Sequence, residues 1–235
     1  MYTLRAARER GRTELDWLES RHTFSFAEYY DPEVMGFGDL RVINDDIVAP
    51  GTGFGMHPHR DMEIISIVLS GALEHKDSIG SGSVIRPGDV QIMTAGSGIM
   101  HSEFNPSQTE PVHFLQIWIL TNRKDHPPAY EQKAFKAEEM KNAMCLVVSG
   151  TGEDGSLKIN QDLRLYQAIL EKDAKVSYKI TKDRKYWIQV ASGKIAVNDQ
   201  ILDEGDGLAI LDEENRLEFT GLEDGSNFIF FDLRT

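Results

Sequence analysis

The sequence of 235 residues predicts an all-β protein composed of two β-barrels in tandem. Three observations support this prediction. Short apolar or alternating runs recur along the whole chain, turn-forming residues separate these runs, and the two halves of the chain resemble each other. A chain of this length can bury one large core, or two cores of about 100 to 120 residues each.

The apolar runs have the length of strands rather than of helices. The strongest are LRVINDDIV, EIISIVL, DVQIM, VHFLQIWIL, LRLYQAIL, YWIQV, LAIL and NFIFFDL. Segments rich in Gly, Pro, Asn and Asp lie between them. This alternation of strand-length runs and turn-forming segments is typical of β-sandwiches and β-barrels. Long amphipathic patterns are nearly absent. One helix or linker is expected near KAFKAEEMKNAM at 133–144, which is rich in good helix formers.

An internal repeat favours two barrels over one. A shift of 122 residues aligns Ile47 with Ile169 and places the turn at Ser70-Gly71 on Ser192-Gly193. PGDVQIM at 87–93 then aligns with EGDGLAI at 204–210 once five residues are removed from a loop. Each half therefore contains the same series of strands and turns, as a duplicated barrel would. We expect one domain over residues 1–130 and a second over residues 131–235.

Composition and charge argue against several functional classes. The net charge of −13 repels nucleic acid on average, and the only arginine-rich stretch, Arg5 to Arg12, includes Glu9. No run approaches the roughly 20 apolar residues of a transmembrane helix. The single cysteine, Cys145, excludes an internal disulfide framework, and the first residues lack the apolar segment of a secretory signal. We therefore expect a cytoplasmic protein that binds neither membranes nor, directly, DNA.

Histidines supply the candidate functional site. His57 and His59 lie at i and i+2 in GMHPHRDMEI, so on a strand both rings point to one face about 6 to 7 Å apart, where one metal ion can bridge them. His101 and Glu103 in GIMHSEFN repeat this spacing. Three imidazoles and one carboxylate suit a divalent first-row transition metal such as Fe, Ni, Mn, Cu, Co or Zn.

The second half of the chain provides an internal comparison for these histidines. All seven histidines lie at or before residue 126, and the 122-residue shift aligns His57 with Lys179 and His59 with Thr181. A role confined to the first half explains this asymmetry better than a requirement of the shared fold. The alternative is that HPHRD is an exposed loop, that His101 caps a turn and that Glu103 is a solvated charge.

The spacing around the first pair of histidines resembles the first motif of the cupin family, G(X)5HXH(X)3–4E(X)6G. Gly51, His57, His59, Glu63 and Gly71 follow its order, with seven residues instead of six before the last glycine.

The second pair lies in a stretch that ends like the second cupin motif, GXXH(X)3N. Gly98, His101 and Asn105 fit this ending, whereas upstream Gly88 lies ten residues before Gly98 instead of the usual eight, and no proline precedes Gly98. The resemblance implies two jelly-roll-like cupin barrels, of which the N-terminal one binds metal and the C-terminal one lacks ligands.

A longer stretch resembles the pirin family, in particular bacterial pirin-like proteins with quercetin 2,3-dioxygenase activity. RHTFSFAEYYDPEVMGFGDLRVINDD at 21–46 precedes GMHPHRDMEI and TAGSGIMHSEFN, and the match is strongest over about 17–120. The resemblance implies that His57, His59, His101 and Glu103 hold one divalent metal ion, with iron as the first expectation. Glu63, the ligand expected in ordinary cupins, would instead have a hydrogen-bonding role.

The resemblance also implies a reaction. A flavonol would bind the metal through its 3-hydroxyl and 4-keto oxygens, and O2 would cleave the heterocyclic ring with release of carbon monoxide. Glu103 would be the catalytic base that takes the 3-hydroxyl proton. One alternative is a metal-binding regulatory protein of pirin type, which captures a protein partner without turnover. Another is a sugar isomerase or other cupin enzyme, which would have a polar pocket.

The remaining candidates are weaker. His75 in LEHKD and His113 in PVHFLQIW lie on expected strands, where packed or surface histidines are common. His22 lies in the pirin-like RHTFSF but is not assigned a ligand role. The aromatic run FSFAEYY would either line a pocket or fill the barrel.

Overall fold

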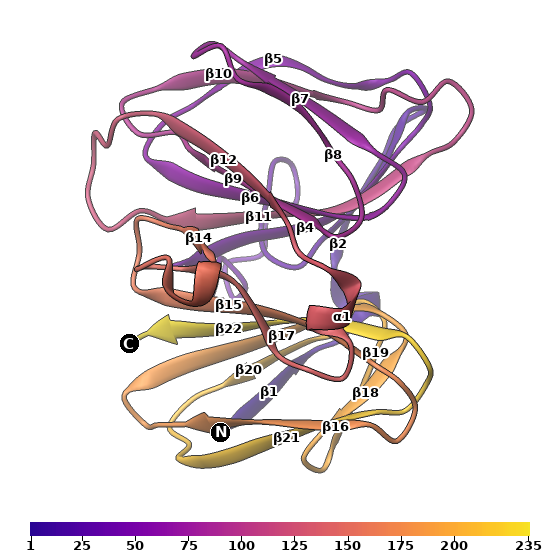
Figure 1. Ribbon diagram of the computed structural model, residues 1–235, viewed down its shortest axis with the longest axis vertical. Helices are drawn as coiled ribbons and strands as arrows, with labels where there is room; N and C mark the ends of the chain where they lie inside the picture. Colours follow the sequence, from indigo (N-terminus) through magenta and orange to yellow (C-terminus); the bar gives the residue numbers. More distant parts are fainter. The chain divides into compact units, whose positions relative to one another are not determined.

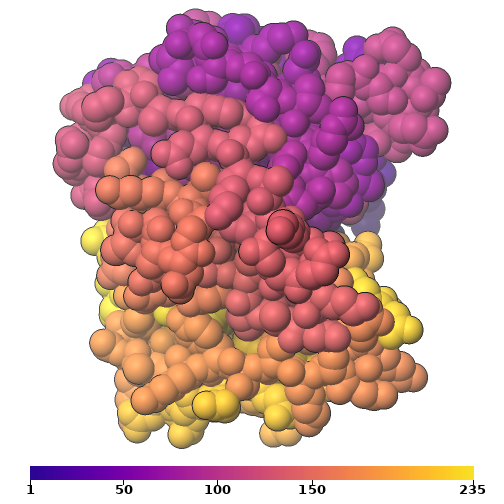
Figure 2. Space-filling model, viewed as in Figure 1, coloured from indigo at the N-terminus to yellow at the C-terminus, as the bar shows by residue number.

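The computed structural model describes residues 1–235 and confirms the prediction of an all-β fold with two barrels (Figure 1). The chain divides into two compact units, one formed by residues 11–134 and 159–161 and the other by residues 1–10, 135–158 and 162–235. In each unit a seven-stranded sheet faces a four-stranded sheet. Figure 2 shows the atoms that cover one face of the molecule.

The unit formed by residues 11–134 and 159–161 contains the strands of the first repeat. They are β2 (Gly11–Glu14), β3 (Leu18–His22), β4 (Leu40–Val48), β5 (Gly53–His59), β6 (Met62–Ser70), β7 (Leu73–Asp77), β8 (Gly82–Ile85), β9 (Asp89–Thr94), β10 (Ile99–Phe104), β11 (Val112–Leu120) and β12 (Ala129–Ala134). The larger sheet has the order β12-β9-β6-β11-β4-β3-β2, and the smaller sheet has the order β5-β10-β7-β8.

The other unit repeats this arrangement. Its strands are β1 (Tyr2–Arg5), β13 (Cys145–Ser149), β14 (Leu157–Lys158), β15 (Leu163–Leu170), β16 (Lys175–Ile180), β17 (Arg184–Ser192), β18 (Lys194–Val197), β19 (Gln200–Asp203), β20 (Gly207–Ile210), β21 (Asn215–Gly221) and β22 (Ser226–Arg234). The sheets have the orders β1-β20-β17-β22-β15-β13-β14 and β16-β21-β18-β19. These orders correspond except at one edge, where β2 precedes β3 and pairs antiparallel with it, whereas β14 follows β13 and pairs parallel with it. The shared order of the other strands confirms the repeat.

The aligned Ser-Gly turns have the same backbone geometry in both units. Gly71 joins β6 to β7 with φ +78°, and Gly193 joins β17 to β18 with φ +75°. These left-handed conformations are open to glycine at no steric cost. A Cβ on Gly71 would also lie 2.5 Å from the backbone oxygen of Pro111.

The edge strands of the two larger sheets come from unexpected parts of the chain. β1 pairs with β20, from Tyr2 opposite Ile210 to Arg5 opposite Gly207. β12 occupies the corresponding edge of the other sheet, where it pairs with β9. A division after residue 130 would therefore cut through β12 and would separate β1 from its partner strand.

The region expected to form a helix over 133–144 is mostly not helical. Residues 133 and 134 belong to β12, because this strand adds to the edge of β9, and helix α1 is limited to Ala137–Met140. Two short 3-10 helices, Ala7–Glu9 and Glu153–Gly155, complete the helical content. None of these helices has the length and apolar character needed to cross a bilayer.

Candidate metal centre

A β-bulge in β5 determines which of its side chains face the barrel interior. His57 pairs with His101 of β10, but the next inward pair joins Phe54, rather than Gly55, to Glu103. Side chains alternate along a regular strand, so residues three apart share a face only where an extra residue is inserted. Because of the bulge, Phe54, His57 and His59 all line one cavity.

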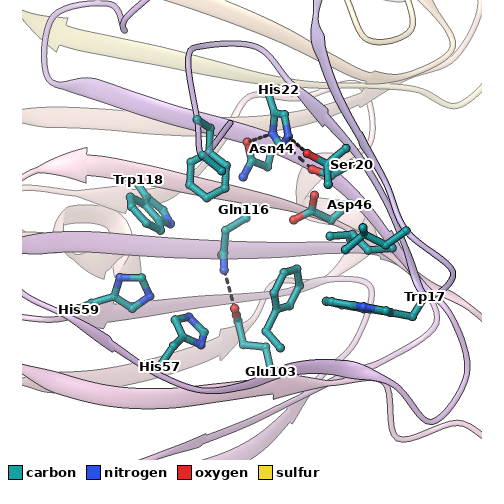
Figure 3. Close-up of a pocket in the computed structure, with 16 residues that line it drawn as sticks. Trp17, Ser20, His22, Asn44, Asp46, His57, His59, Glu103, Gln116 and Trp118 are labelled. Atoms are coloured by element: carbon teal, nitrogen blue, oxygen red, sulfur yellow. Dashed lines mark hydrogen bonds between the residues drawn. The ribbon is translucent and has the colours of Figure 1, made fainter. Parts of the chain in front are cut away.

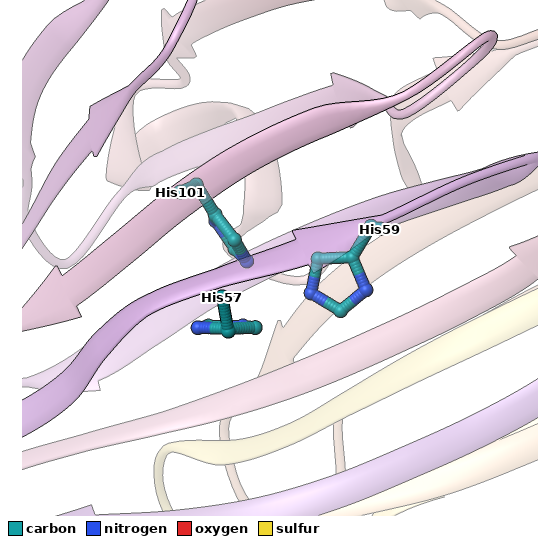
Figure 4. Close-up of side chains that lie close together, drawn as sticks. All are labelled: His57, His59 and His101. Carbon is teal, nitrogen blue, oxygen red and sulfur yellow. The ribbon is translucent and has the colours of Figure 1, made fainter.

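The structure brings three of the predicted ligands together. His57, His59 and His101 each place a ring nitrogen within 4.8 Å of the others, and the ring centroids lie 4.4 to 4.8 Å apart (Figure 4). The Nδ1–H of His57 donates to the Gly55 carbonyl at 2.7 Å, so its Nε2 carries the lone pair. A bulge carbonyl therefore selects the tautomer of His57 that suits metal binding.

His101 has a buried nitrogen without a partner. The residue is fully buried, and its Nε2 makes no hydrogen bond. Burial, followed by the neighbouring His57, His59 and His75, lowers the pKa of His101 to about 2. Burial and His57 likewise lower the pKa of His59 to about 4. Both rings are therefore neutral at pH 7, the form in which histidine binds metals.

A chain of hydrogen bonds behind His101 fixes its tautomer. His75 Nε2 lies 3.0 Å from the Asp77 carboxylate, and His75 Nδ1 lies 3.4 Å from His101 Nδ1. Asp77 accepts, so neutral His75 donates from Nε2 and accepts at Nδ1. His101 then donates from Nδ1 and directs the Nε2 lone pair at His57 and His59. Carboxylate partners of this kind commonly orient metal-binding histidines.

Glu103 lies on the same wall of the barrel but makes different contacts. It forms a second set of close donor atoms with His75 and His101. Its carboxylate accepts hydrogen bonds from Gln116 Nε2 at 2.6 Å and from Ser66 Oγ at 3.3 Å. Burial, together with the charge of Asp46, raises the pKa of Glu103 to about 7. Figure 3 shows the carboxylate beside His57 and directed toward Gln116.

A close approach of two strands positions Glu103. Gly53 of β5 pairs with Phe104, and a Cβ added to Gly53 would lie 2.2 Å from the Glu103 carbonyl oxygen. Only glycine allows β5 and β10 to come this near each other.

Glu63 has no place in either set of possible ligands. Its carboxylate accepts from Thr94 Oγ1 at 2.9 Å and from Asn160 Nδ2 at 3.2 Å. Burial is the main cause that raises its pKa. Glu63 thus ties residues 159–161 to the first barrel, and this hydrogen-bonding role is the one expected for it from the sequence.

A cavity of about 240 Å³ is lined by His57, His59 and Glu103. Its aromatic lining includes Trp17, Phe26, Phe54 and Trp118 (Figure 3). Trp17 and Phe54 pack edge to face at 5.0 Å, and Trp118 packs edge to face on His59 at 4.9 Å. Phe26 comes from the run FSFAEYY and lines the cavity, whereas Phe24 of the same run is buried in the core. Both roles expected for this run, pocket lining and core packing, are therefore present.

Several polar residues of the site were not singled out from the sequence. Ser66 and Gln116 bond each other at 2.8 Å and hold Glu103, while Asp46 lines the cavity. Ser66 and Gln116 are lone polar residues inside the apolar runs EIISIVL and VHFLQIWIL, whereas Asp46 lies in the polar triplet NDD of LRVINDDIV. Because a buried polar side chain must be hydrogen-bonded, a single polar residue in an apolar run is the sequence signal that could have identified Ser66 and Gln116.

The other weak candidates have separate roles. His113 Nε2 contacts Asp45 Oδ1 at 2.6 Å, away from the histidine cluster. His22 lines the cavity, and its two ring nitrogens contact Thr13 and Asn44 at 2.8 Å each.

The second barrel has neither the bulge nor the histidines. β16 pairs with β21 in unbroken register from Lys175 to Ile180. Tyr178 and Ile180 are more buried than Lys179, which is exposed. The structural counterparts of His57 and His59 are therefore Tyr178 and Ile180, one residue from the ungapped alignment. The tyrosine packs on Phe230 at 4.8 Å, so this interior is an aromatic core.

Loss of His75 should weaken metal binding without removing a predicted ligand. We expect His75→Ala to lower the affinity for a divalent metal about 10- to 100-fold, because His101 loses the partner that fixes its ring. Competition with a chromophoric chelator measures this. His113→Ala, which removes a histidine outside the cluster, should retain the wild-type affinity. Equal affinities in all three proteins would contradict the role assigned to His75.

The fold and this cluster define a protein of two cupin barrels, one of which carries a set of metal-type ligands. The chain belongs to the pirin family. The family described as Pirin matches residues 3–119, and the family described as Quercetinase C-terminal cupin domain matches residues 146–233.

Similar proteins agree with this assignment. Quercetin 2,3-dioxygenase of Escherichia coli K12 is 50% identical over 214 residues, 91% of each chain. A pirin-like protein of Caulobacter vibrioides is 40% identical over 215 residues, 91% of this chain and 92% of that one. The crystal structure of the bacterial pirin YhhW from Escherichia coli in complex with nickel(II) superimposes with a TM-score of 0.94 at 47% identity, covering 100% of this chain and 99% of that chain.

Proposed function

We propose that this protein is a metal-dependent dioxygenase of pirin type that cleaves quercetin or a related flavonol with O2 and releases carbon monoxide. The observation that carries the proposal is the unpartnered, buried Nε2 of His101, which lies close to His57 and His59. His57 and His59 in turn line an aromatic cavity. A structural metal site is closed by its protein ligands and does not require a cavity beside the metal. The activity named for the relative that is 50% identical supports the same reaction.

The side chains fit one divalent metal ion. His57, His59 and His101 would hold it, and Glu103 would complete the set from the neighbouring position on β10. When bound, the metal would acidify the flavonol 3-hydroxyl and orient the substrate. Neutral imidazoles and a carboxylate accept several divalent ions. Iron is our first expectation, and nickel is the ion bound in the structure of the relative.

Residues of the chain would transfer the proton, position the base and bind the substrate. Glu103 takes the proton of the 3-hydroxyl group, because its carboxylate lies beside the histidines that would hold the metal. Gln116 and Ser66 hold that carboxylate in place. Trp17 and Phe54 offer flat apolar surfaces to the fused rings of a flavonol.

Oxygen consumption tests the proposal. Metal-loaded protein should consume O2 when quercetin is added, and carbon monoxide should appear in proportion. Removal of the metal with a chelator should stop both, and its return should restore both. Turnover that survives chelation, or quercetin loss without carbon monoxide, would exclude this reaction.

A further inference from the structure

Asp46 is a buried carboxylate with an unsatisfied oxygen in the cavity wall. The residue lies on β4 and is only 3% exposed, yet its Oδ1 has no hydrogen-bond partner. Its one side-chain hydrogen bond comes from Ser20, which lies opposite on β3. A buried acceptor of this kind costs free energy until a donor reaches it.

The surrounding charges do not supply this donor. Asp45, the next residue, points to the other face of β4 and is bonded to His113. Glu103, which also faces the cavity, is an acceptor and repels a second negative charge. Burial, as the largest cause, raises the pKa of Asp46 to about 7.

The cavity around Asp46 is shaped for a flat apolar group. Trp17, Leu18 and Phe54 line it together with Asp46 and Ser20. Figure 3 shows the Asp46 carboxylate directed inward, with Gln116 between it and the two histidines of β5. A ligand that extends from the histidines past Gln116 therefore brings its far end to a carboxylate among aromatic rings. A phenolic hydroxyl combines the flat ring and the hydrogen-bond donor that this place requires.

We propose that Asp46 is a specificity residue that accepts a hydrogen bond from a phenolic hydroxyl of the flavonol, on a ring remote from the 3-hydroxyl and 4-keto oxygens. This inference rests on the proposed function. It predicts that polyhydroxylated flavonols bind better than 3-hydroxyflavone, which has the 3-hydroxyl and 4-keto groups but no phenolic hydroxyl. Galangin, which has phenolic hydroxyls only on the fused ring, identifies which ring Asp46 contacts.

Anaerobic binding separates recognition from turnover. Metal-loaded protein is titrated with quercetin, galangin and 3-hydroxyflavone without O2, and quenching of tryptophan fluorescence is followed, since Trp17 and Trp118 line the cavity. At pH 8, where Asp46 with a pKa of about 7 is mostly ionised, wild type should bind quercetin at least about tenfold more tightly than 3-hydroxyflavone, the factor typical of one hydrogen bond to a charged group. Asp46→Leu and Asp46→Ala, which have no acceptor, should lose this preference, whereas Asp46→Asn, whose amide oxygen still accepts, should keep part of it.

Asp45→Asn is the matched control. It removes the neighbouring carboxylate on the other face of β4 and should keep the wild-type preference. Metal content is measured in every variant, so that loss of metal is not mistaken for loss of recognition. If Asp46→Ala does not fold, Asp46→Leu, which fills a similar space without an acceptor, still gives the comparison.

The outcomes separate the inference from the proposed function. Equal binding of quercetin and 3-hydroxyflavone by wild type, no binding of either, or an unchanged preference in the variants without an acceptor would overturn the role of Asp46. Turnover of quercetin that is independent of Asp46 would leave the dioxygenase proposal intact. Binding that depends on Asp46 without any O2 consumption would support the inference and overturn the dioxygenase proposal.

Discussion

Replacing His57 with alanine should abolish both metal binding and flavonol turnover. His57 and His59 come from the same bulged strand, and the ring of His57 lies 4.4 Å from that of His101, between centroids. Its removal deletes one of three converging nitrogens. The loss of affinity should exceed the roughly 100-fold effect of losing only a partner that orients a ligand. Metal analysis after dialysis, with an oxygen-electrode assay on the same sample, measures both effects.

His113→Ala is the matched control for His57→Ala. It also deletes one imidazole from a strand of the first barrel, but this ring contacts Asp45 away from the cluster. The control should retain the metal content and the rate of wild type. If His57→Ala kept a full complement of metal, the three histidines would not form the site. If it lost metal yet kept turnover, the reaction would not depend on the metal.

Replacing Glu103 with glutamine should separate proton transfer from metal binding. The amide has nearly the same shape but is no base, so turnover per bound metal should fall about 100-fold or more. Metal affinity should fall less, because the three histidines remain. Steady-state rates normalised to metal content, compared with the affinity from chelator competition, give both quantities.

Glu63→Gln provides the comparison for Glu103→Gln. Both glutamates are buried in the same barrel, but Glu63 contacts Thr94 and Asn160 and belongs to neither set of possible ligands. Its replacement should leave turnover per bound metal unchanged. Equal losses in the two variants would point to a general effect of a buried glutamate and would refute the assignment of the base to Glu103.

Much of the fold followed from local patterns. Runs such as VHFLQIWIL coincide with strands because apolar residues of strand length between turn residues have few other stable arrangements. The repeat was readable because the turn at Gly71 and its counterpart at Gly193 both need a left-handed backbone. The histidines followed from their spacing together with the resemblance to the pirin family, and the structure brings His57, His59 and His101 together.

Other features depend on contacts that the sequence does not display. The bulge in β5 arises from pairing with β10, and an ungapped alignment that lacks it matched His57 to the exposed Lys179 instead of Tyr178. Of the helix or linker expected over 133–144, only residues 137–140 are helical, and residues 133 and 134 belong to a strand because 129–134 pair with the edge of β9. Asp46 escaped notice because its missing partner is visible only when all neighbouring strands are in place.

The strand pairing of β1 has a consequence for how the protein is made. The leading strand of each repeat completes the sheet of the other repeat, since β1 pairs with β20 and β12 pairs with β9. This is the connectivity of a strand-swapped dimer carried in one chain. Residues 2–5 are made long before their partners at 207–210. The histidine barrel has all its strands once residue 134 has been made, whereas β1 of the second barrel must wait for β20 before it can pair.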